Sequence, residues 1–168
     1  MVEKSIPQND KGYPLIGEES IMSQKAHGTS EKPVMDNLRY GCDFETADRI
    51  CNFNRHYAEH SGYAFTNKIT WVEEMRKNKD QEMTYYDSVT GKPLFIAPRG
   101  RTTEDFIKES KAHGWPSFRD NEVVWDNVRC LKNGETVSVD GAHLGHDLPD
   151  KSGNRYCINL VCIAGNPA

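Results

Sequence analysis

The stretch of residues 139–159 constrains the fold and the chemistry of this chain more than any other. It ends in a segment where three functional side chains occupy alternate positions, Arg155, Cys157 and Asn159. Side chains two residues apart on a strand point to the same face, so a strand here aligns the three groups in a row. A guanidinium beside a thiol lowers the pKa of the thiol from about 8.5 and increases the share of thiolate. We therefore expect Cys157 to be a nucleophile.

Each of these residues also has a purely structural explanation. A cysteine in a strand is often a small buried hydrophobic residue. His143 and His146, three residues apart, form a weak metal-binding signal on their own. Asn159 could simply satisfy a backbone group. The presence of all these residue types within residues 143–159, with an arginine on the side of the thiol, favours a reactive site.

The stretch resembles the catalytic segment of the B-type methionine sulfoxide reductases, which reads His-Leu-Gly-His, a glycine-containing turn and Arg-Tyr-Cys-Ile-Asn. Two further blocks resemble the same family. Residues 114–118 read Gly-Trp-Pro-Ser-Phe, and residues 86–95 read Tyr-Asp-Ser-Val-Thr-Gly-Lys-Pro-Leu-Phe. The three blocks have the order and approximate spacing of the family, and the resemblance covers about residues 84–165.

The resemblance implies thiol-dependent reduction of methionine-R-sulfoxide, free or in oxidised proteins, as a repair of oxidative damage. Cys157 would attack the sulfur and become a sulfenic acid, which an external thiol then reduces. The family's pattern implies the following site residues: catalytic Cys157, His143, His146, Asn159, Arg155 and Asp150, and substrate-binding Trp115 and Phe118.

The proposed reaction needs a thiolate, a proton donor for the oxygen and an apolar pocket for the methyl group. Arg155 would lower the pKa of the thiol. One of the two histidines would supply the proton and, with Asn159, hold the oxygen. The flat ring of Trp115 would face the methyl group, where its π-system favours developing positive charge.

Departures from the family concern the metal and the resolving thiol. Many members bind a structural zinc through two Cys-x-x-Cys pairs, but those positions here are Asp87, Thr90, Val137 and Asp140. Without four thiolates we expect neither zinc nor another cofactor. His113 stands where many members have a cysteine, and residues 160–162 read Leu-Val-Cys instead of Ser-Ala-Ser.

No cysteine is a convincing resolving partner for the sulfenic acid. Cys162 would face away from Cys157 on a continuous strand, some 16 Å along it. Cys130, on another strand, is a candidate that the sequence cannot place relative to Cys157. Direct reduction by a thioredoxin-like protein or a small thiol is an equal alternative.

Composition and charge exclude several classes of function. The net charge is −4 and the pI is about 5.9, which gives no basic surface for nucleic acid. No stretch approaches about eighteen consecutive apolar residues, and residues 1–10 contain no apolar signal-peptide core. Five cysteines at irregular spacing do not indicate a disulfide framework. We therefore expect a cytoplasmic protein that binds neither membrane nor nucleic acid, with organelle targeting left open.

The N-terminal half divides by pattern into two segments. Residues 1–38 are polar and aperiodic, which predicts a flexible or surface-wrapping tail without its own fold. Residues 39–80 form a helical N-terminal extension. Its first amphipathic helix starts at a cap, Thr46 or Asp43, and reaches Tyr57, with Cys51 facing the core. A second short helix covers residues 70–78.

Residues 81–168 form the predicted catalytic domain. The pattern predicts a hairpin over residues 83–97, a helix over 103–110 with a cap at Thr102 or Thr103, and further strands at 123–125, 128–131, 136–139 and 155–163. The run of short strands predicts a mainly β, α+β fold, a small antiparallel β-barrel or folded sheet with an N-terminal helical flank.

Two other functions remain compatible with the sequence. The chain could be a non-enzymatic binding module on the same fold, because a fold does not fix a function. It could also be a metal-binding or redox-sensing protein that uses His143, His146 and Cys157. We favour the enzyme, because a binding module has no chemical need for the full set: Trp115, His143, His146, Arg155, Cys157 and Asn159.

Overall fold

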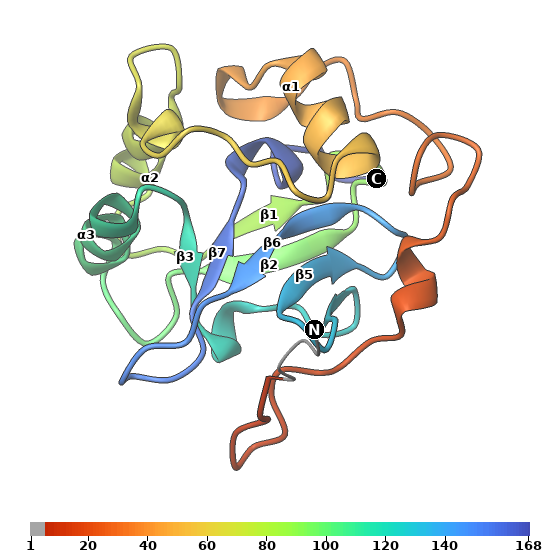
Figure 1. The fold of residues 1–168 in the computed structure, drawn as a ribbon. Helices are drawn as coiled ribbons and strands as arrows, with labels where there is room; N and C mark the ends of the chain where they lie inside the picture. Colours follow the sequence, from red (N-terminus) through yellow and green to blue (C-terminus); the bar gives the residue numbers. More distant parts are fainter. Residues whose placement is uncertain (1–5) are drawn as a thin grey trace.

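The computed structural model describes residues 6–168 and combines short helices with two antiparallel sheets (Figure 1). The larger sheet has the order β3-β7-β6-β5-β4, and the smaller sheet pairs β1 with β2. The strands are β1 Met83–Tyr86, β2 Pro93–Ala97, β3 Ser117–Phe118, β4 Val128–Cys130, β5 Glu135–Ser138, β6 His143–Asp147 and β7 Tyr156–Ile158. The predicted class, mostly β with antiparallel sheets, is confirmed. No closed barrel forms among residues 6–168.

Short helices from both halves of the chain pack around the sheets (Figure 1). The α-helices are α1 Phe44–Asp48, α2 Trp71–Lys77 and α3 Thr103–His113, and α1 continues directly into a π-helical turn, η3 Arg49–Phe53. Short 3₁₀ turns complete the order: η1 Glu19–Met22, η2 Arg39–Gly41, η4 Tyr63–Phe65, η5 Asp120–Glu122 and η6 Leu160–Cys162.

Two helices begin at capping residues that the sequence predicted. Asp43 caps α1 by accepting the N–H of Thr46 at 2.8 Å, and Thr102 caps α3 by accepting the N–H of Asp105 at 3.1 Å. Gly114 ends α3 with a φ of 91°, in the left-handed region that favours glycine. The hairpin predicted over residues 83–97 is also confirmed as the β1–β2 pair.

Three predicted elements are wrong in extent. The first helix ends at Phe53 rather than Tyr57, because Asn54 turns to an extended conformation and its side chain accepts the N–H of His56 at 3.1 Å. Residues 123–125 make only a single bridge, between Phe95 and Val123, and then turn. The final strand stops at Ile158, and residues 160–162 form η6 instead.

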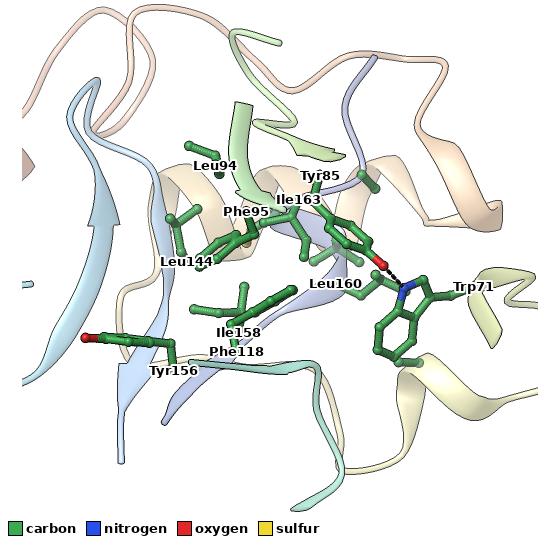
Figure 2. Packing of buried hydrophobic residues seen from close by; sticks show 14 of the residues in the cluster. Trp71, Tyr85, Leu94, Phe95, Phe118, Leu144, Tyr156, Ile158, Leu160 and Ile163 are labelled. Carbon is green, nitrogen blue, oxygen red and sulfur yellow. Dashed lines mark hydrogen bonds between the residues drawn. The ribbon is translucent and has the colours of Figure 1, made fainter. Parts of the chain in front are cut away.

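The main core fills the space between the two sheets and the helices (Figure 2). Trp71 of α2 donates its ring N–H to the hydroxyl of Tyr85 at 2.8 Å, so both polar groups are satisfied inside the core. Phe95 and Phe118 stack with ring centroids 4.3 Å apart. Cys51 is buried, as predicted from its helical position.

Residues 6–38 run along the edge of the larger sheet and on to η3 and the turn after β1, which is the surface-wrapping alternative. Their backbone pairs with strand β4, where Cys130 donates its N–H to Leu15 at 2.9 Å and accepts that of Gly17 at 2.8 Å. Met22 is buried against Leu131 and Val137 in a second apolar cluster. The division of the chain into three segments stays a prediction. Within residues 6–168, no helix has the length and apolar character needed to cross a membrane.

Candidate functional site

A cavity of about 310 Å³ lies where β6, β7 and the segment after η3 meet. It gathers five of the predicted site residues: Trp115, His143, His146, Cys157 and Asn159. Its remaining lining comes from residues with no predicted role: Arg55, His56, Tyr57, Ala58, Gly145 and Leu148.

Strand register explains why a thiol and an imidazole share this cavity. Cys157 on β7 is the direct antiparallel partner of His146 on β6. Side chains of directly opposite residues point to the same face of a sheet, with their Cβ atoms about 5 Å apart. Cys157 is half-buried, so its thiol is open to the cavity rather than sealed in the core.

A β-bulge brings the second histidine to the same side. Thr136 pairs with Gly145 while Val137 pairs with His143, so Leu144 is an extra residue in β6. Without this insertion, residues three apart would face opposite sides of the strand. With it, His143 points to the cavity and Leu144 points into the core beside Ile158 (Figure 2). The two imidazole ring centroids are 6.1 Å apart.

Gly145 lets β6 and β7 approach closely at this point. A Cβ atom built on Gly145 would lie 2.0 Å from the carbonyl oxygen of Cys157 and 2.9 Å from the Cα of Ile158. Both neighbours are backbone atoms, which cannot move aside without separating the strands. Only glycine therefore fits at position 145.

Arg155 lies beside the thiol, as the alternation of residues predicted. Its positive charge lowers the pKa of the Cys157 thiol, but burial acts in the opposite direction and is the larger effect. The pKa of Cys157 is therefore raised above its ordinary value, and the expected net lowering is wrong. Arg155 is itself buried, and within residues 6–168 its Nε and Nη1 atoms have no hydrogen-bond partner.

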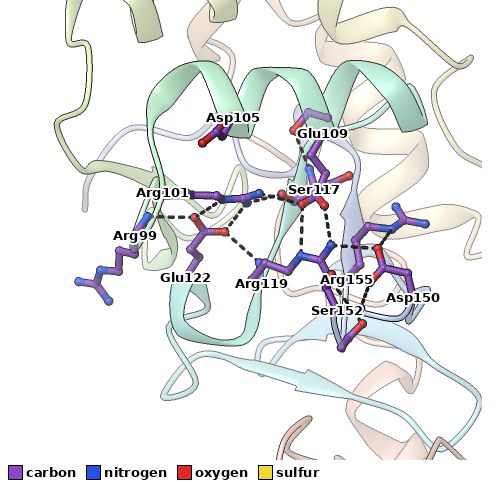
Figure 3. Close-up of polar contacts among 12 residues, drawn as sticks. Arg99, Arg101, Asp105, Glu109, Ser117, Arg119, Glu122, Asp150, Ser152 and Arg155 are labelled. Atoms are coloured by element: carbon purple, nitrogen blue, oxygen red, sulfur yellow. Dashed lines mark hydrogen bonds and ion pairs between the residues drawn. The ribbon is translucent and has the colours of Figure 1, made fainter.

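Asp150 is directed to arginines rather than to the histidines (Figure 3). Its carboxylate accepts two hydrogen bonds from Arg119, at 3.0 and 2.9 Å, and lies 3.9 Å from Nε of Arg155. The bonds from Arg119 lower the pKa of Asp150 to about 2. Arg119 also binds Glu109 of α3, so an ion-pair network anchors the turn that precedes Arg155.

Glu59 holds two of the site residues in place through its backbone. Its carbonyl oxygen accepts the ring N–H of Trp115 at 3.1 Å, and its N–H donates to Oδ1 of Asn159 at 3.0 Å. The amide group of Asn159 also donates to the carbonyl of Leu144 at 3.1 Å. The Glu59 carboxylate accepts the N–H of Val161 at 2.9 Å, which explains why the chain leaves the sheet there. Burial raises the pKa of Glu59 to about 8.

The cavity has an apolar rim that the sequence did not reveal. Tyr57 and Leu148 line the cavity and are 39% and 47% exposed, which is high for large apolar side chains. Tyr57 was expected to be the last residue of the first helix, with no role in the site. The sequence signal that could have revealed this rim is the cluster of histidine and tyrosine residues that follows Phe53.

Other predicted residues lie away from the cavity. Phe118 is fully buried in the main core and stacks on Phe95. Cys130 lies on β4, three strand spacings or about 14 Å from β7, and its thiol contacts Thr136. Cys162 lies in η6 rather than on a strand, and its sulfur is 2.9 Å from that of Cys51.

Asp87 and Asp140, two of the four residues at the positions of the zinc-binding cysteines, make ordinary contacts. Lys92 and Asp140 make an ion pair of 2.9 Å between the two turns. Asp87 is buried and accepts the N–H of Val89 at 2.8 Å. Among the residues that the structure describes, no three His, Cys, Asp or Glu side chains gather as a metal site would require.

Comparison with curated proteins finds relatives that match part of the chain. No protein-family model matches the chain. The Peptide methionine sulfoxide reductase MsrB of Pseudomonas fluorescens (strain Pf0-1) is 36% identical over 83 residues, which are 48% of this chain and 51% of that protein. The chain therefore spans about half the length of the curated relative that it matches. About half of the chain is MsrB-like in sequence.

Proposed function

We propose that this protein reduces the R epimer of methionine sulfoxide to methionine, with Cys157 as the nucleophile and an external thiol as the reductant. One observation carries the proposal: the Cys157 thiol, both imidazoles and the Trp115 ring line a single cavity. The similarity of about half of the chain to a protein named as a methionine sulfoxide reductase supports the same reaction class.

The first step transfers the thiol proton. Burial, together with the charge of His143, lowers the pKa of His146, so this imidazole is neutral at pH 7 and can act as a base. Its register partner, Cys157, is in the thiol form because its pKa is raised. His146 accepts the thiol proton as the sulfur attacks, and the adjacent guanidinium of Arg155 stabilises the thiolate.

The second step breaks the sulfur–oxygen bond. The Cys157 sulfur bonds to the substrate sulfur, and the oxygen takes the proton held by His146. A bond then forms between this oxygen and the Cys157 sulfur while the substrate sulfur loses its bonds to both, which leaves methionine and a Cys157 sulfenic acid. Arg155 does not line the cavity, so its guanidinium would act on this step through the charge of the adjacent Cys157 sulfur. Asn159, fixed by Glu59 and Leu144, orients the remaining polar edge of the cavity.

An external thiol completes the cycle. Two equivalents of thiol convert the sulfenic acid back to the cysteine, forming one disulfide and one water. We propose a thioredoxin-like protein or a small thiol for this role, because Cys130 and Cys162 lie elsewhere in the fold. Residues 81–168 would form the catalytic domain, with the extension of residues 39–80 closing the cavity and no resident zinc.

The test is turnover of the two separated epimers of a chromophore-labelled methionine sulfoxide, with dithiothreitol as reductant. The wild type should reduce the R epimer and leave the S epimer intact, and Cys157→Ser should reduce neither. Cys42→Ser, which changes the other half-buried cysteine, is the matched control and should keep the activity. A folded wild type that reduces neither epimer would contradict the proposal and favour a binding module.

A further inference from the structure

We infer that Glu135 and Arg55 are positioning residues of the site: Glu135 fixes the proton of His143 on Nδ1, and Arg55 fixes Glu135. The Nε2 atom of His143 is then the ring nitrogen left for the cavity. This inference rests on the proposed function and extends it to two residues that the sequence comparison did not suggest.

The contact between Glu135 and His143 is direct and buried. Oε2 of Glu135 lies 2.8 Å from Nδ1 of His143, and the two residues are only 3% and 2% exposed. An ionised carboxylate can only accept hydrogen bonds. The proton of this bond must therefore be on Nδ1, whatever the charge of the ring.

Arg55 keeps the carboxylate ionised and in place. Its Nε lies 3.0 and 3.2 Å from the two oxygens of Glu135, and its Nη2 lies 2.5 Å from Oε1. This fork fixes the carboxylate in two directions. Burial acts against ionisation of Glu135, but the bonds from His143 and Arg55 outweigh it, so the pKa of the carboxyl is lowered.

The location of the Arg55–Glu135–His143 cluster distinguishes it from an ordinary structural ion pair. Arg55 and His143 both line the cavity that contains Cys157. Glu135 is the register partner of His146, so its side chain approaches the histidines along the sheet. The remaining N–H group of Arg55 binds Glu19 of η1 at 2.7 Å. The N-terminal half thus reaches the reacting groups through Arg55.

The kinetic test compares Glu135→Gln with a matched control. This substitution keeps the shape of the side chain but removes the charge that fixes the Nδ1 proton. We expect kcat to fall ~10- to 100-fold with little change in KM, because Nε2 of His143 would no longer be held toward the cavity in one protonation state; this is less than the ~10²- to 10⁴-fold that the group transferring the proton supplies. Asp48→Asn is the control, because Asp48 makes an equivalent 2.8 Å contact with His27 outside the cavity. It should leave kcat unchanged.

A spectroscopic test reads the proton directly. Two-bond ¹H–¹⁵N correlations of His143 should report a proton on Nδ1 in the wild type. In Glu135→Gln the amide can either accept or donate, so a mixture of tautomers should appear. A purely structural ion pair would change the unfolding free energy without changing this pattern. Arg55→Met is the second variant, and it should shift kcat in the same direction even if Glu135→Gln does not fold.

The outcomes separate this inference from the proposed function. An active wild type whose kcat and Nδ1 signal survive in Glu135→Gln would overturn the positioning role alone. An equal loss of kcat in Asp48→Asn would also overturn it, because the effect would then follow stability. A folded wild type without activity on either epimer would overturn the proposed function and this role with it.

Discussion

Cys157 and His146 are directly opposite each other on adjacent antiparallel strands, and both face the same cavity. Their relative position is set by backbone hydrogen bonds rather than by a flexible loop, so it needs no rearrangement when a substrate arrives. The thiol and its proposed base are therefore held together by the fold itself.

Arg155 should control how easily the Cys157 thiol ionises. Burial raises the pKa of this thiol, and the guanidinium opposes that rise. Removing the guanidinium in Arg155→Met should raise the pKa further, so alkylation of Cys157 by iodoacetamide should shift to higher pH. The measurement is the alkylation rate of the Cys157 peptide by mass spectrometry across about pH 7–10, the range around the ordinary thiol pKa.

Arg99→Met is the control for this experiment, because Arg99 is a partly exposed cation paired with Glu82. Its alkylation profile should match that of the wild type. An unchanged profile in Arg155→Met, or a shift to lower pH, would contradict the assigned contact.

Glu59 should make the protein less stable as the pH rises. Its folded-state pKa is raised to about 8 by burial, whereas the unfolded-state value is about 4.3. Between these two pH values the folded state therefore binds more protons than the unfolded state. The contribution of Glu59 to the free energy of unfolding falls as the pH increases. Glu59→Gln cannot ionise and keeps an acceptor for Val161, so its advantage over wild type should grow from about pH 4 to about pH 8.

Urea denaturation at a series of pH values measures this difference. Glu45→Gln, on the exposed face of α1, is the control and should follow the wild type over the same interval. A difference between Glu59→Gln and wild type that shrinks with rising pH would show that the carboxyl is ionised in the folded protein.

Gly145→Ala should damage both stability and activity. The new methyl group would meet the backbone of β7, so the strands must separate or the side chains repack, at a cost of about 1–3 kcal/mol. Separation moves His146 away from Cys157, and R-epimer turnover should fall more than stability alone explains. Gly165→Ala is the matched comparison, because its Cβ would lie 2.1 Å from the carbonyl oxygen of Asp87, a similar backbone clash, and Gly165 does not line the cavity. Equal losses of turnover in the two variants would contradict this explanation.

Local signals in the sequence predicted much of the fold. The caps at Asp43 and Thr102 and the β1–β2 hairpin depend on neighbouring residues; each cap is one of the two residues expected, and the hairpin is where it was expected. Contacts between distant residues were not predictable. The bond from Val161 to Glu59 joins residues 102 positions apart and ends the last strand. The bulge at Leu144 depends on register with β5.

The residues of the candidate site likewise fall into those that the sequence predicted and those that it did not. The motif residues Cys157, His143, His146, Asn159 and Trp115 were all identified before their cavity was known. Arg55 and Glu135 were not identified, because they are 80 positions apart in the sequence and only the fold brings them together. The predicted lowering of the pKa of Cys157 was wrong for a related reason. The sequence contains the arginine that lowers this pKa but does not indicate how deeply the thiol is buried.

The central claim is that Cys157 removes the oxygen, and a single-turnover experiment without any reducing thiol tests it most directly. Wild-type protein mixed with excess methionine-R-sulfoxide should yield methionine in an amount equal to the protein. The same sample should gain one oxygen atom on Cys157, trapped by a sulfenic-acid reagent and located by mass spectrometry. Methionine formed with Cys157 unmodified, or in Cys157→Ser, would contradict the account.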